Sequence, residues 1–176
     1  MRSLLRGLFR FILRVFFRRI EVAGLMRVPA RGPVLFAINH PNGLIDPLFL
    51  LCLAPRPVSF LGKAPLFRMP LIGWLVRALD SIPVYRRQDE GADRNRNRET
   101  FGRARALLER GGTIAIAPEG TSHSGPKLKP LKTGAARIAL GAATTEPIRI
   151  VPAGLFYTYK GIFRSAGLLY FGEPLE

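Results

Sequence analysis

The chain has 176 residues, enough for one domain with a buried core, and a hydrophobic content of 48% with 12 Phe excludes a disordered protein. The formal net charge of +15 predicts anionic partners: nucleic acid, anionic lipid or phosphorylated substrates. The single cysteine excludes an internal disulfide and favours a reducing compartment. One cysteine and two histidines are too few for a zinc site, so no metal is expected.

Residues 1–20 predict a basic amphipathic helix, because arginine recurs every four residues from position 2 to position 18 among leucine, isoleucine and phenylalanine. A helix of about 20 residues reaches across a bilayer, but an arginine near the bilayer centre costs roughly 2.5–3.5 kcal/mol. Arg6, Arg10 and Arg14 occupy the middle of this helix. We therefore expect it to lie peripherally on the cytoplasmic face of an anionic membrane, where each arginine contributes about 1 kcal/mol. The alternative is a helix packed on its own domain with its arginines in solvent.

Residues 21–176 predict a single α/β domain with a mixed, largely parallel sheet flanked by helices, because short apolar runs alternate with longer amphipathic stretches. Strands are expected at 33–39, 58–62, 81–85, 113–117, 148–155 and 168–172, and helices at 47–54, 71–79, about 95–110 and 133–143.

The segment NHPNGLIDP at 39–47 joins the first of these strands to the first helix of the domain. His40 and Asp46 are six residues apart, and Pro41 and Gly43 disfavour a helix between them, so a tight turn must join the pair. Pro47 suits the first position of a helix, which makes Asp46 the predicted N-cap. Whether the turn also brings the Asp46 carboxylate to the His40 imidazole is left open by the sequence.

Four segments resemble the sequence blocks of the phospholipid/glycerol acyltransferase family and follow one another in its order. They are NHPNGLID, IPVYRR, APEGTSHSGPKLKPLKTGAARIAL and IVPAGL, and the resemblance covers about residues 28–172. It implies transfer of an acyl group from acyl-CoA or acyl carrier protein, as co-substrates without a further cofactor, to a glycerol phosphate acceptor. Lysophosphatidate is the first expectation for this acceptor and glycerol 3-phosphate the second.

The resemblance also implies roles for residues of the first two blocks. His40 would be the general base, and Asp46 would hold its ring and favour its protonated form. Five residues lie between them, one more than is usual in the family. Arg86 would bind the acceptor phosphate, with Arg87 as its competitor.

In the third block the family commonly has arginine after Thr121, where this chain has Ser122. The phosphate-binding cation is therefore expected among Lys127, Lys129 and Lys132, whereas His123 is expected to be a solvated loop histidine. Val151 and Pro152 of the fourth block are expected to line the site by backbone and shape. The resulting set of substrate-binding candidates is Asn39, Arg86, Glu119, Gly120, Thr121 and Lys132.

Two other classes of protein remain as alternatives. The longer spacing between His40 and Asp46 leaves room for a catalytically silent, membrane-associated protein of the same fold. The charge also fits a nucleic-acid-binding protein, but no signature of such a protein is present, so no nucleic-acid partner is expected. The acyl chain length, the donor carrier, the oligomeric state and the presence of a further C-terminal part are left open.

Overall fold

The computed structural model describes residues 2–85, 94–125 and 127–175. Its strands are β1 (Arg19–Ala23), β2 (Val34–Ile38), β3 (Ser59–Lys63), β4 (Ile82–Val84), β5 (Thr113–Ile116), β6 (Arg149–Tyr157) and β7 (Ala166–Phe171). Its helices are α1 (Arg2–Phe16), α2 (Ile45–Leu53), α3 (Pro70–Ala78), α4 (Arg94–Glu109) and α5 (Gly134–Ala139), with two short 3-10 helices, η1 (Leu25–Arg27) and η2 (Ala64–Arg68).

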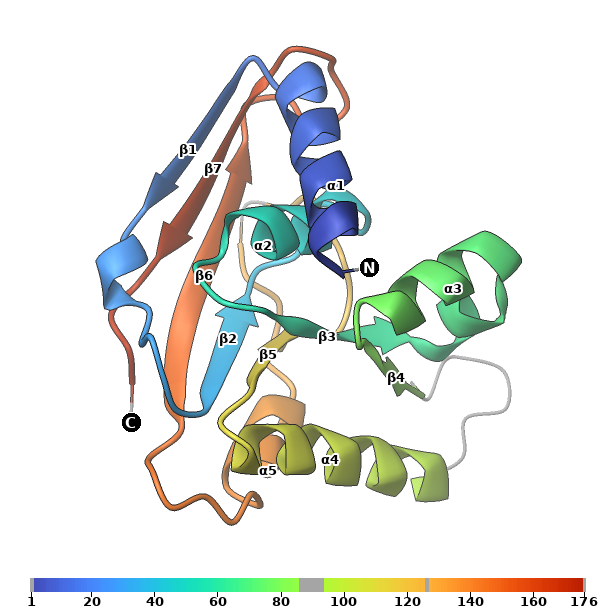
Figure 1. The fold of residues 1–176 in the computed structure, drawn as a ribbon, viewed down its shortest axis with the longest axis vertical. Coiled ribbons are helices and arrows are strands. Elements are labelled where there is room, and N and C mark those ends of the chain that lie inside the picture. The colour runs from blue at the N-terminus through green and yellow to red at the C-terminus, as the bar shows by residue number, and fades with distance from the viewer. Residues whose placement is uncertain (1, 86–93, 126, 176) are drawn as a thin grey trace.

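The strands form one seven-stranded sheet in the order β1-β7-β6-β2-β5-β3-β4 (Figure 1). β6 and β7 pair antiparallel, whereas β2 pairs in parallel with both β5 and β6, and β1 pairs in parallel with β7. The predicted mixed, largely parallel α/β sheet is therefore confirmed. Its centre is β2, whose Val34, Leu35 and Phe36 are fully buried, as expected for a parallel strand covered on both faces.

Helices pack on both faces of this sheet and divide the core into two clusters. One cluster joins Phe36 to Phe49 of α2 and Leu13 of α1, and the other joins Leu35 to Leu108 of α4. Full burial of a leucine or phenylalanine side chain contributes about 1.5–3 kcal/mol. These contacts fix α1 and α2 on the same face of the sheet, above the strand that leads into the NHPNGLIDP segment.

The predicted helix over residues 1–20 is too long, because α1 ends at Phe16 and Arg19–Ala23 form β1, a strand that the sequence did not predict. The amide of Phe17 still bonds the carbonyl of Leu13, but the amide of Arg18 bonds Ser165 instead, and β1 then pairs with β7. The change comes from pairing with a distant strand, which the local pattern of arginine and phenylalanine does not reveal.

Three arginines of α1 point toward the domain, whereas Arg14 is exposed, so for these three the expectation that the arginines face lipid or solvent is wrong. Arg2 donates to the carbonyl of Val58 at 2.5 Å, Arg6 to that of Ala54 at 2.7 Å, and Arg10 to that of Cys52 at 2.8 Å. The carbonyls of Cys52 and Ala54 lie at the C-terminal end of α2, where carbonyls lack helical partners and the helix dipole is negative, whereas that of Val58 directly precedes β3. Two guanidinium groups therefore hold α1 on the C-terminal end of α2, and a third holds it on the segment that leads into β3.

With these three arginines directed inward, α1 presents an apolar face to solvent. None of the helices in the described parts of the chain is long and apolar enough to cross a bilayer. The exposed residues of this face are Leu4, Leu8, Phe11, Ile12 and Val15, with exposed fractions between 43% and 77%.

Candidate active site

The carboxyl ends of β2, β5 and β6 meet at one edge of the sheet and carry most of the predicted site. Asn39 and His40 follow β2, Glu119 follows β5, and Tyr157 is the last residue of β6. Open α/β sheets bind ligands at this edge, because the loops that leave neighbouring strands converge there.

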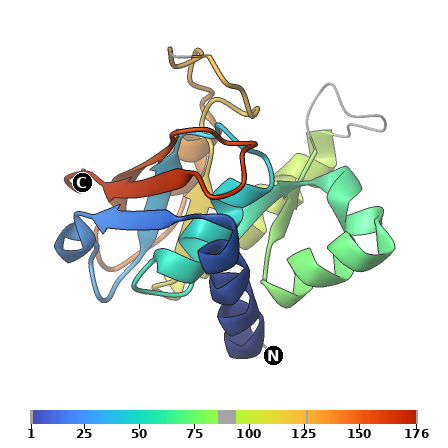
Figure 2. The ribbon, with the colours of Figure 1, turned by 90° about the horizontal axis from the view of Figure 1, so that it is seen from above.

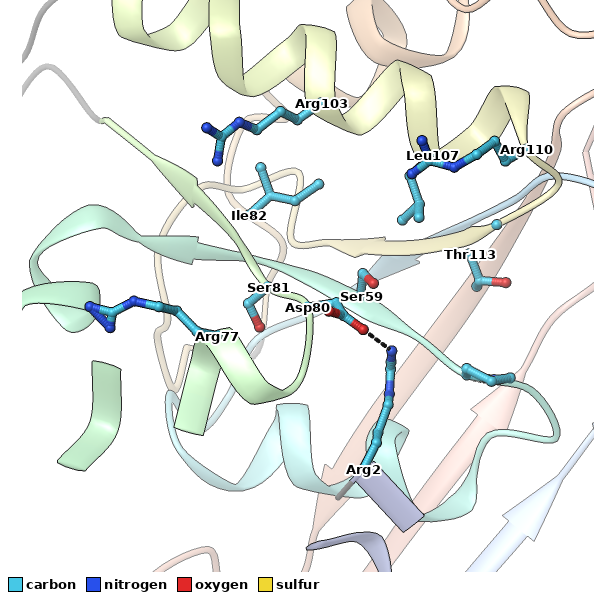
Figure 3. Close-up of a pocket in the computed structure, with 12 residues that line it drawn as sticks. Arg2, Ser59, Arg77, Asp80, Ser81, Ile82, Arg103, Leu107, Arg110 and Thr113 are labelled. Atoms are coloured by element: carbon cyan, nitrogen blue, oxygen red, sulfur yellow. Dashed lines mark hydrogen bonds and ion pairs between the residues drawn. The ribbon is translucent and has the colours of Figure 1, made fainter. Parts of the chain in front are cut away.

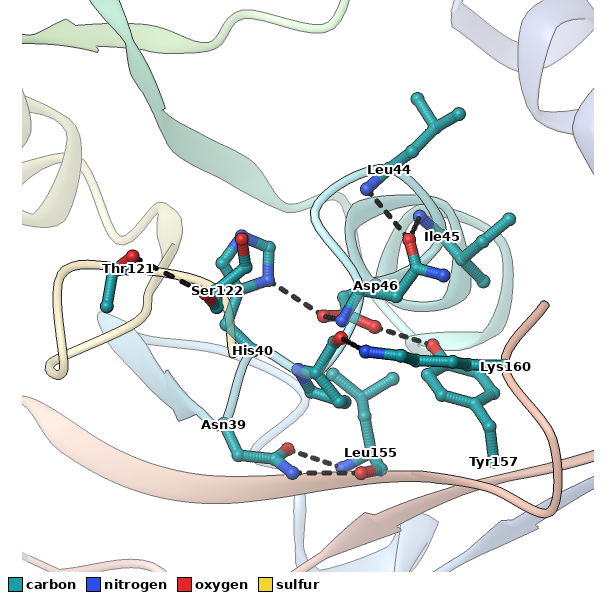
Figure 4. Close-up of polar contacts among 12 residues, drawn as sticks. Asn39, His40, Leu44, Ile45, Asp46, Thr121, Ser122, Leu155, Tyr157 and Lys160 are labelled. Atoms are coloured by element: carbon teal, nitrogen blue, oxygen red, sulfur yellow. Dashed lines mark hydrogen bonds and ion pairs between the residues drawn. The ribbon is translucent and has the colours of Figure 1, made fainter. Parts of the chain in front are cut away.

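His40 and Asp46 contact each other despite the extra residue between them (Figure 4). His40 Nδ1 lies 2.8 Å from Asp46 Oδ2, and the Asp46 side chain is fully buried whereas that of His40 is 17% exposed. An ionised carboxylate only accepts, so His40 donates through Nδ1 and keeps the lone pair of Nε2 for a substrate proton. The longer spacing, which left room for a catalytically silent protein, does not separate the two side chains.

Hydrogen bonds of Asn42 stabilise the turn that contains the extra residue. Its Oδ1 accepts from the amides of Leu44 and Ile45, both at 3.2 Å, and its own amide donates to Asp46 Oδ2 at 2.8 Å. The prediction that Asp46 is the N-cap is wrong, because α2 begins at Ile45 and Asp46 lies in its first turn. The side chain of Asn42 satisfies the first amides instead, which frees the Asp46 carboxylate to turn inward.

Tyr157 holds the second oxygen of Asp46 and was not predicted from the sequence. Its hydroxyl donates to Asp46 Oδ1 at 2.7 Å. Burial raises the pKa of Tyr157 far above its ordinary value, and the negative charge of Asp46 raises it further, so the hydroxyl stays protonated. The only signal in the sequence is the alternation along β6, which points Leu155 and Tyr157 to the same face.

Asn39 closes the end of β2 onto β6. Its Nδ2 donates to the carbonyl of Leu155 at 2.8 Å, and its Oδ1 accepts from the amide of Leu155 at 2.6 Å. Both ends of the amide are therefore bonded within the protein, and they fix the main chain that carries His40. Val151 and Pro152 pair with Phe36 and Ala37, below the site, so β6 reaches the site through Leu155 and Tyr157 instead.

Glu119 forms a second buried carboxylate, paired with His123 at 2.5 Å between Oε2 and Nε2. Burial favours a higher pKa for Glu119, but the hydrogen bonds from the Lys129 amide and from His123 outweigh it and lower the pKa. The prediction of a solvated His123 is wrong, because its side chain is 14% exposed and its Nδ1 accepts from the amide of Gly125. The amide of His123 also bonds the carbonyl of His40 at 3.1 Å, which joins the two loops.

Gly120 and Lys132 lie against each other beside this carboxylate. Gly120 has a φ of +71°, and a Cβ at this position would lie 2.7 Å from Lys132 Nζ. Glycine is therefore favoured by the backbone conformation, whereas the end of the exposed lysine side chain could move aside for a Cβ. Thr121 bonds only weakly to the carbonyl of Ser122, at 3.4 Å, and Lys127, Lys129 and Lys132 are all exposed.

Lys160 is a further cation that no motif indicated. It lies in the loop between β6 and β7, and its Nζ donates to the carbonyl of Pro41 at 3.1 Å and to Ser124 Oγ. It thus bridges the His40 turn and the loop that follows Glu119. The predicted phosphate-binding residue Arg86, with its competitor Arg87, lies outside the described residues.

Comparisons with known proteins point to one family. The family model described as Acyltransferase matches residues 19–155. The chain is 30% identical to the chloroplastic 1-acyl-sn-glycerol-3-phosphate acyltransferase of Brassica napus, over 89% of this chain and 43% of the relative. It is 27% identical to glycerol-3-phosphate O-acyltransferase 1 of Saccharomyces cerevisiae, over 94% of this chain and 33% of the relative. The chain thus spans less than half the length of each.

The fold is also similar to that of a solved structure, the 1-acyl-sn-glycerophosphate acyltransferase PlsC of Thermotoga maritima. The TM-score is 0.74 with 20% identity, over 99% of this chain and 68% of that protein. At this identity the likeness concerns the fold.

Proposed function

Because the chain belongs to the acyltransferase family, we propose that it moves a fatty acyl group from an acyl-CoA or acyl carrier protein thioester to the hydroxyl of a glycerol phosphate acceptor. Lysophosphatidate is our first choice of acceptor and glycerol 3-phosphate the second, since relatives with names of both kinds are similar to this chain. The main support for this proposal is the contact of 2.8 Å between His40 and the fully buried Asp46.

In the proposed reaction, His40 Nε2 takes the proton of the acceptor hydroxyl while its oxygen attacks the thioester carbonyl carbon. The new C–O bond gives a tetrahedral intermediate, the C–S bond then breaks, and the thiolate leaves with the proton returned by His40. Asp46 stabilises the imidazolium between these steps, and a positioned base of this kind contributes about 10²–10⁴ in rate. Burial raises the pKa of the Cys52 thiol to about 11, so the sulfur stays protonated and no acyl-enzyme is invoked.

The acceptor would bind beside Glu119, Gly120 and Thr121. We assign the phosphate to Lys132, whose side chain lies against Gly120, with Arg86 as a second proposed contact. Lys160 is a further candidate because its ammonium lies next to the His40 turn. A lysine binds phosphate as a point charge, so this recognition depends less on geometry than a bidentate arginine contact.

We further propose that the outward apolar face of α1 rests on the cytoplasmic face of a membrane, where lipid acceptors are found. The inward arginines are bonded to carbonyl groups and cannot serve this contact, so insertion of leucine and phenylalanine would supply most of the binding. Arg14 in the last turn of α1, Arg18 after it and Arg19 at the start of β1 are exposed, and each would add about 1 kcal/mol near an anionic surface.

The test is an acyl-transfer assay with purified protein. Acyl-CoA and acyl carrier protein donors are each combined with a panel of lysophospholipids and with glycerol 3-phosphate, and the products are read by mass spectrometry. Acyl transfer to lysophosphatidate that disappears in His40→Ala supports the proposal. Transfer to none of these acceptors would remove it, and full activity in His40→Ala would remove the role of the histidine.

A further inference from the structure

A cavity lies at the amino ends of the strands, at the edge of the sheet opposite His40. Its volume is about 600 Å³, within the range of roughly 300–1,000 Å³ found for small-molecule sites. Ser59, Ile82 and Thr113 begin β3, β4 and β5 and form its floor, while α4 lies across the cavity from Arg2 and Asp80 (Figure 3).

The wall of this cavity is strongly cationic. Four arginines line it: Arg2 from α1, Arg77 from α3, Arg103 from α4, and Arg110, which directly follows α4. Asp80 is the only acidic residue among the lining residues and forms an ion pair with Arg2 at 2.8 Å. Guanidinium groups gathered around one cavity repel one another, and a bound anion removes that cost.

The arginines are only partly engaged by the protein. Arg103 pairs with Glu99 on the surface of α4, and Arg77 donates to the carbonyl of Phe67. The side chain of Arg110 has no hydrogen bond or ion pair with any other residue in the described ranges. The hydroxyl of Thr113 is buried and has no hydrogen-bond partner in the described part of the chain. A buried donor without a partner is destabilising, so the wall offers a hydroxyl for an acceptor that the described residues do not supply.

The surroundings of the cavity are apolar on two sides. α1 and α3 project from the same side of the sheet (Figure 2), and each contributes one arginine to the wall. Leu4 of α1 and Leu71 of α3 are each 77% exposed, and Trp74 of α3 is 50% exposed, although none of the three lines the cavity. A cationic cavity whose bordering helices also carry exposed apolar side chains fits an anionic group that is attached to a lipid, as well as a soluble anion.

We propose that this cavity binds a phosphate group, presented either by the headgroup of an anionic phospholipid or by a soluble phosphate ester. Phosphate oxygens accept hydrogen bonds from guanidinium groups and hydroxyls, both of which line this cavity. The bound ligand would join α1 to α3 and α4. The proposal does not depend on acyl transfer: a protein with His40→Ala keeps the cavity, so loss of catalysis and loss of phosphate binding are separate results.

The experiment compares two double variants of the full chain. R103Q/R110Q removes two arginines of the cavity, and R68Q/R98Q removes two exposed arginines that do not line it, so both lower the net charge equally. Binding of inorganic pyrophosphate is measured by calorimetry and by the fluorescence of Trp74, the single tryptophan, one turn before Arg77. We expect R103Q/R110Q to weaken binding at least about tenfold and R68Q/R98Q less than about twofold.

A second arm uses vesicles of phosphatidylcholine with and without phosphatidic acid. Saturable pyrophosphate binding that only R103Q/R110Q weakens identifies a soluble phosphate ester as the ligand. If pyrophosphate does not bind, a fluorescence response to phosphatidic acid that only R103Q/R110Q loses identifies a lipid headgroup. Equal losses in the two variants would show unlocalised charge attraction and overturn the proposal, as would the absence of a response in both arms.

Discussion

The two edges of the sheet differ in the sign of their charged side chains and in how fully these are hydrogen-bonded. At the carboxyl edge, Asp46 and Glu119 are buried, and each accepts from a histidine and from at least one further donor. At the amino edge, arginines gather around a cavity with one carboxylate among its lining residues. Charges that are saturated by fixed donors keep a catalytic group in one orientation, whereas charges that the protein satisfies only in part suit a ligand that binds and dissociates.

The largest effect is expected from a substitution that breaks the hydrogen bond between His40 and Asp46 at the carboxyl edge. In Asp46→Asn the amide would donate to His40 Nδ1, which moves the imidazole proton to Nε2 and removes the base. We expect kcat for acyl transfer to fall by about 10²–10⁴. Asp80→Asn is the matched control, because it neutralises the carboxylate of the other edge, where left-handed backbone also tolerates asparagine. Equal losses in the two variants would contradict the assignment.

The second largest effect is expected from Tyr157→Phe. It removes the donor to Asp46 Oδ1 and leaves a buried acceptor without a partner, so the free energy of unfolding should fall by about 1–3 kcal/mol. Urea denaturation provides the measurement, and Tyr159→Phe is the control because Tyr159 is 62% exposed. If both changes cost the same, the hydrogen bond to Asp46 does not stabilise the fold.

The pH dependence of stability tests the second buried carboxylate. The pKa of Glu119 is lowered in the folded protein from its ordinary value of 4.5, so its contribution is complete above that value and is lost as the pH falls through the folded pKa. We expect the free energy of unfolding to fall below about pH 4.5 and to fall less steeply in Glu119→Gln. Parallel curves for the two proteins would show that Glu119 does not gain stability from His123 and the Lys129 amide.

The smallest effect is expected at the amino edge, and its sign is opposite. Without ligand, R103Q/R110Q relieves repulsion and loses only one exposed ion pair, so stability should be unchanged or rise by up to about 0.5 kcal/mol. Thermal unfolding in phosphate-free buffer measures this change. A loss of more than about 1 kcal/mol would mean that these arginines hold the fold together, and the contrast between the two edges would disappear.

The parts that the sequence predicted correctly are those that local chemistry controls. Alternating apolar runs indicated the α/β class and all the strands except β1, and Pro41 and Gly43 required a turn between His40 and Asp46. β1 was missed because its residues follow an arginine- and phenylalanine-rich helix without a clear change of pattern. Glycine at position 120 followed from a motif, and the structure supplied its reason in the left-handed backbone.

The parts that the sequence did not reveal all depend on contacts between distant segments. Tyr157 reaches Asp46 across 111 positions, and Lys160 reaches Pro41 across 119, so no local pattern links them. The arginines of α1 illustrate the same limit, because periodicity separates a polar from an apolar face but does not say which face meets the domain.

The sequence by itself determined the fold class, the turn that holds His40 and Asp46, and the basic, amphipathic character of α1. Only the tertiary structure decided that Asp46 reaches the ring, that Tyr157 completes its hydrogen bonds, and that three arginines of α1 face inward. The physical reason is that side-chain patterns record burial and local turns, whereas hydrogen bonds between distant residues depend on the order of strands in the sheet. α1 turns these arginines inward because the carbonyls at the end of α2 lack helical partners and accept hydrogen bonds from the guanidinium groups.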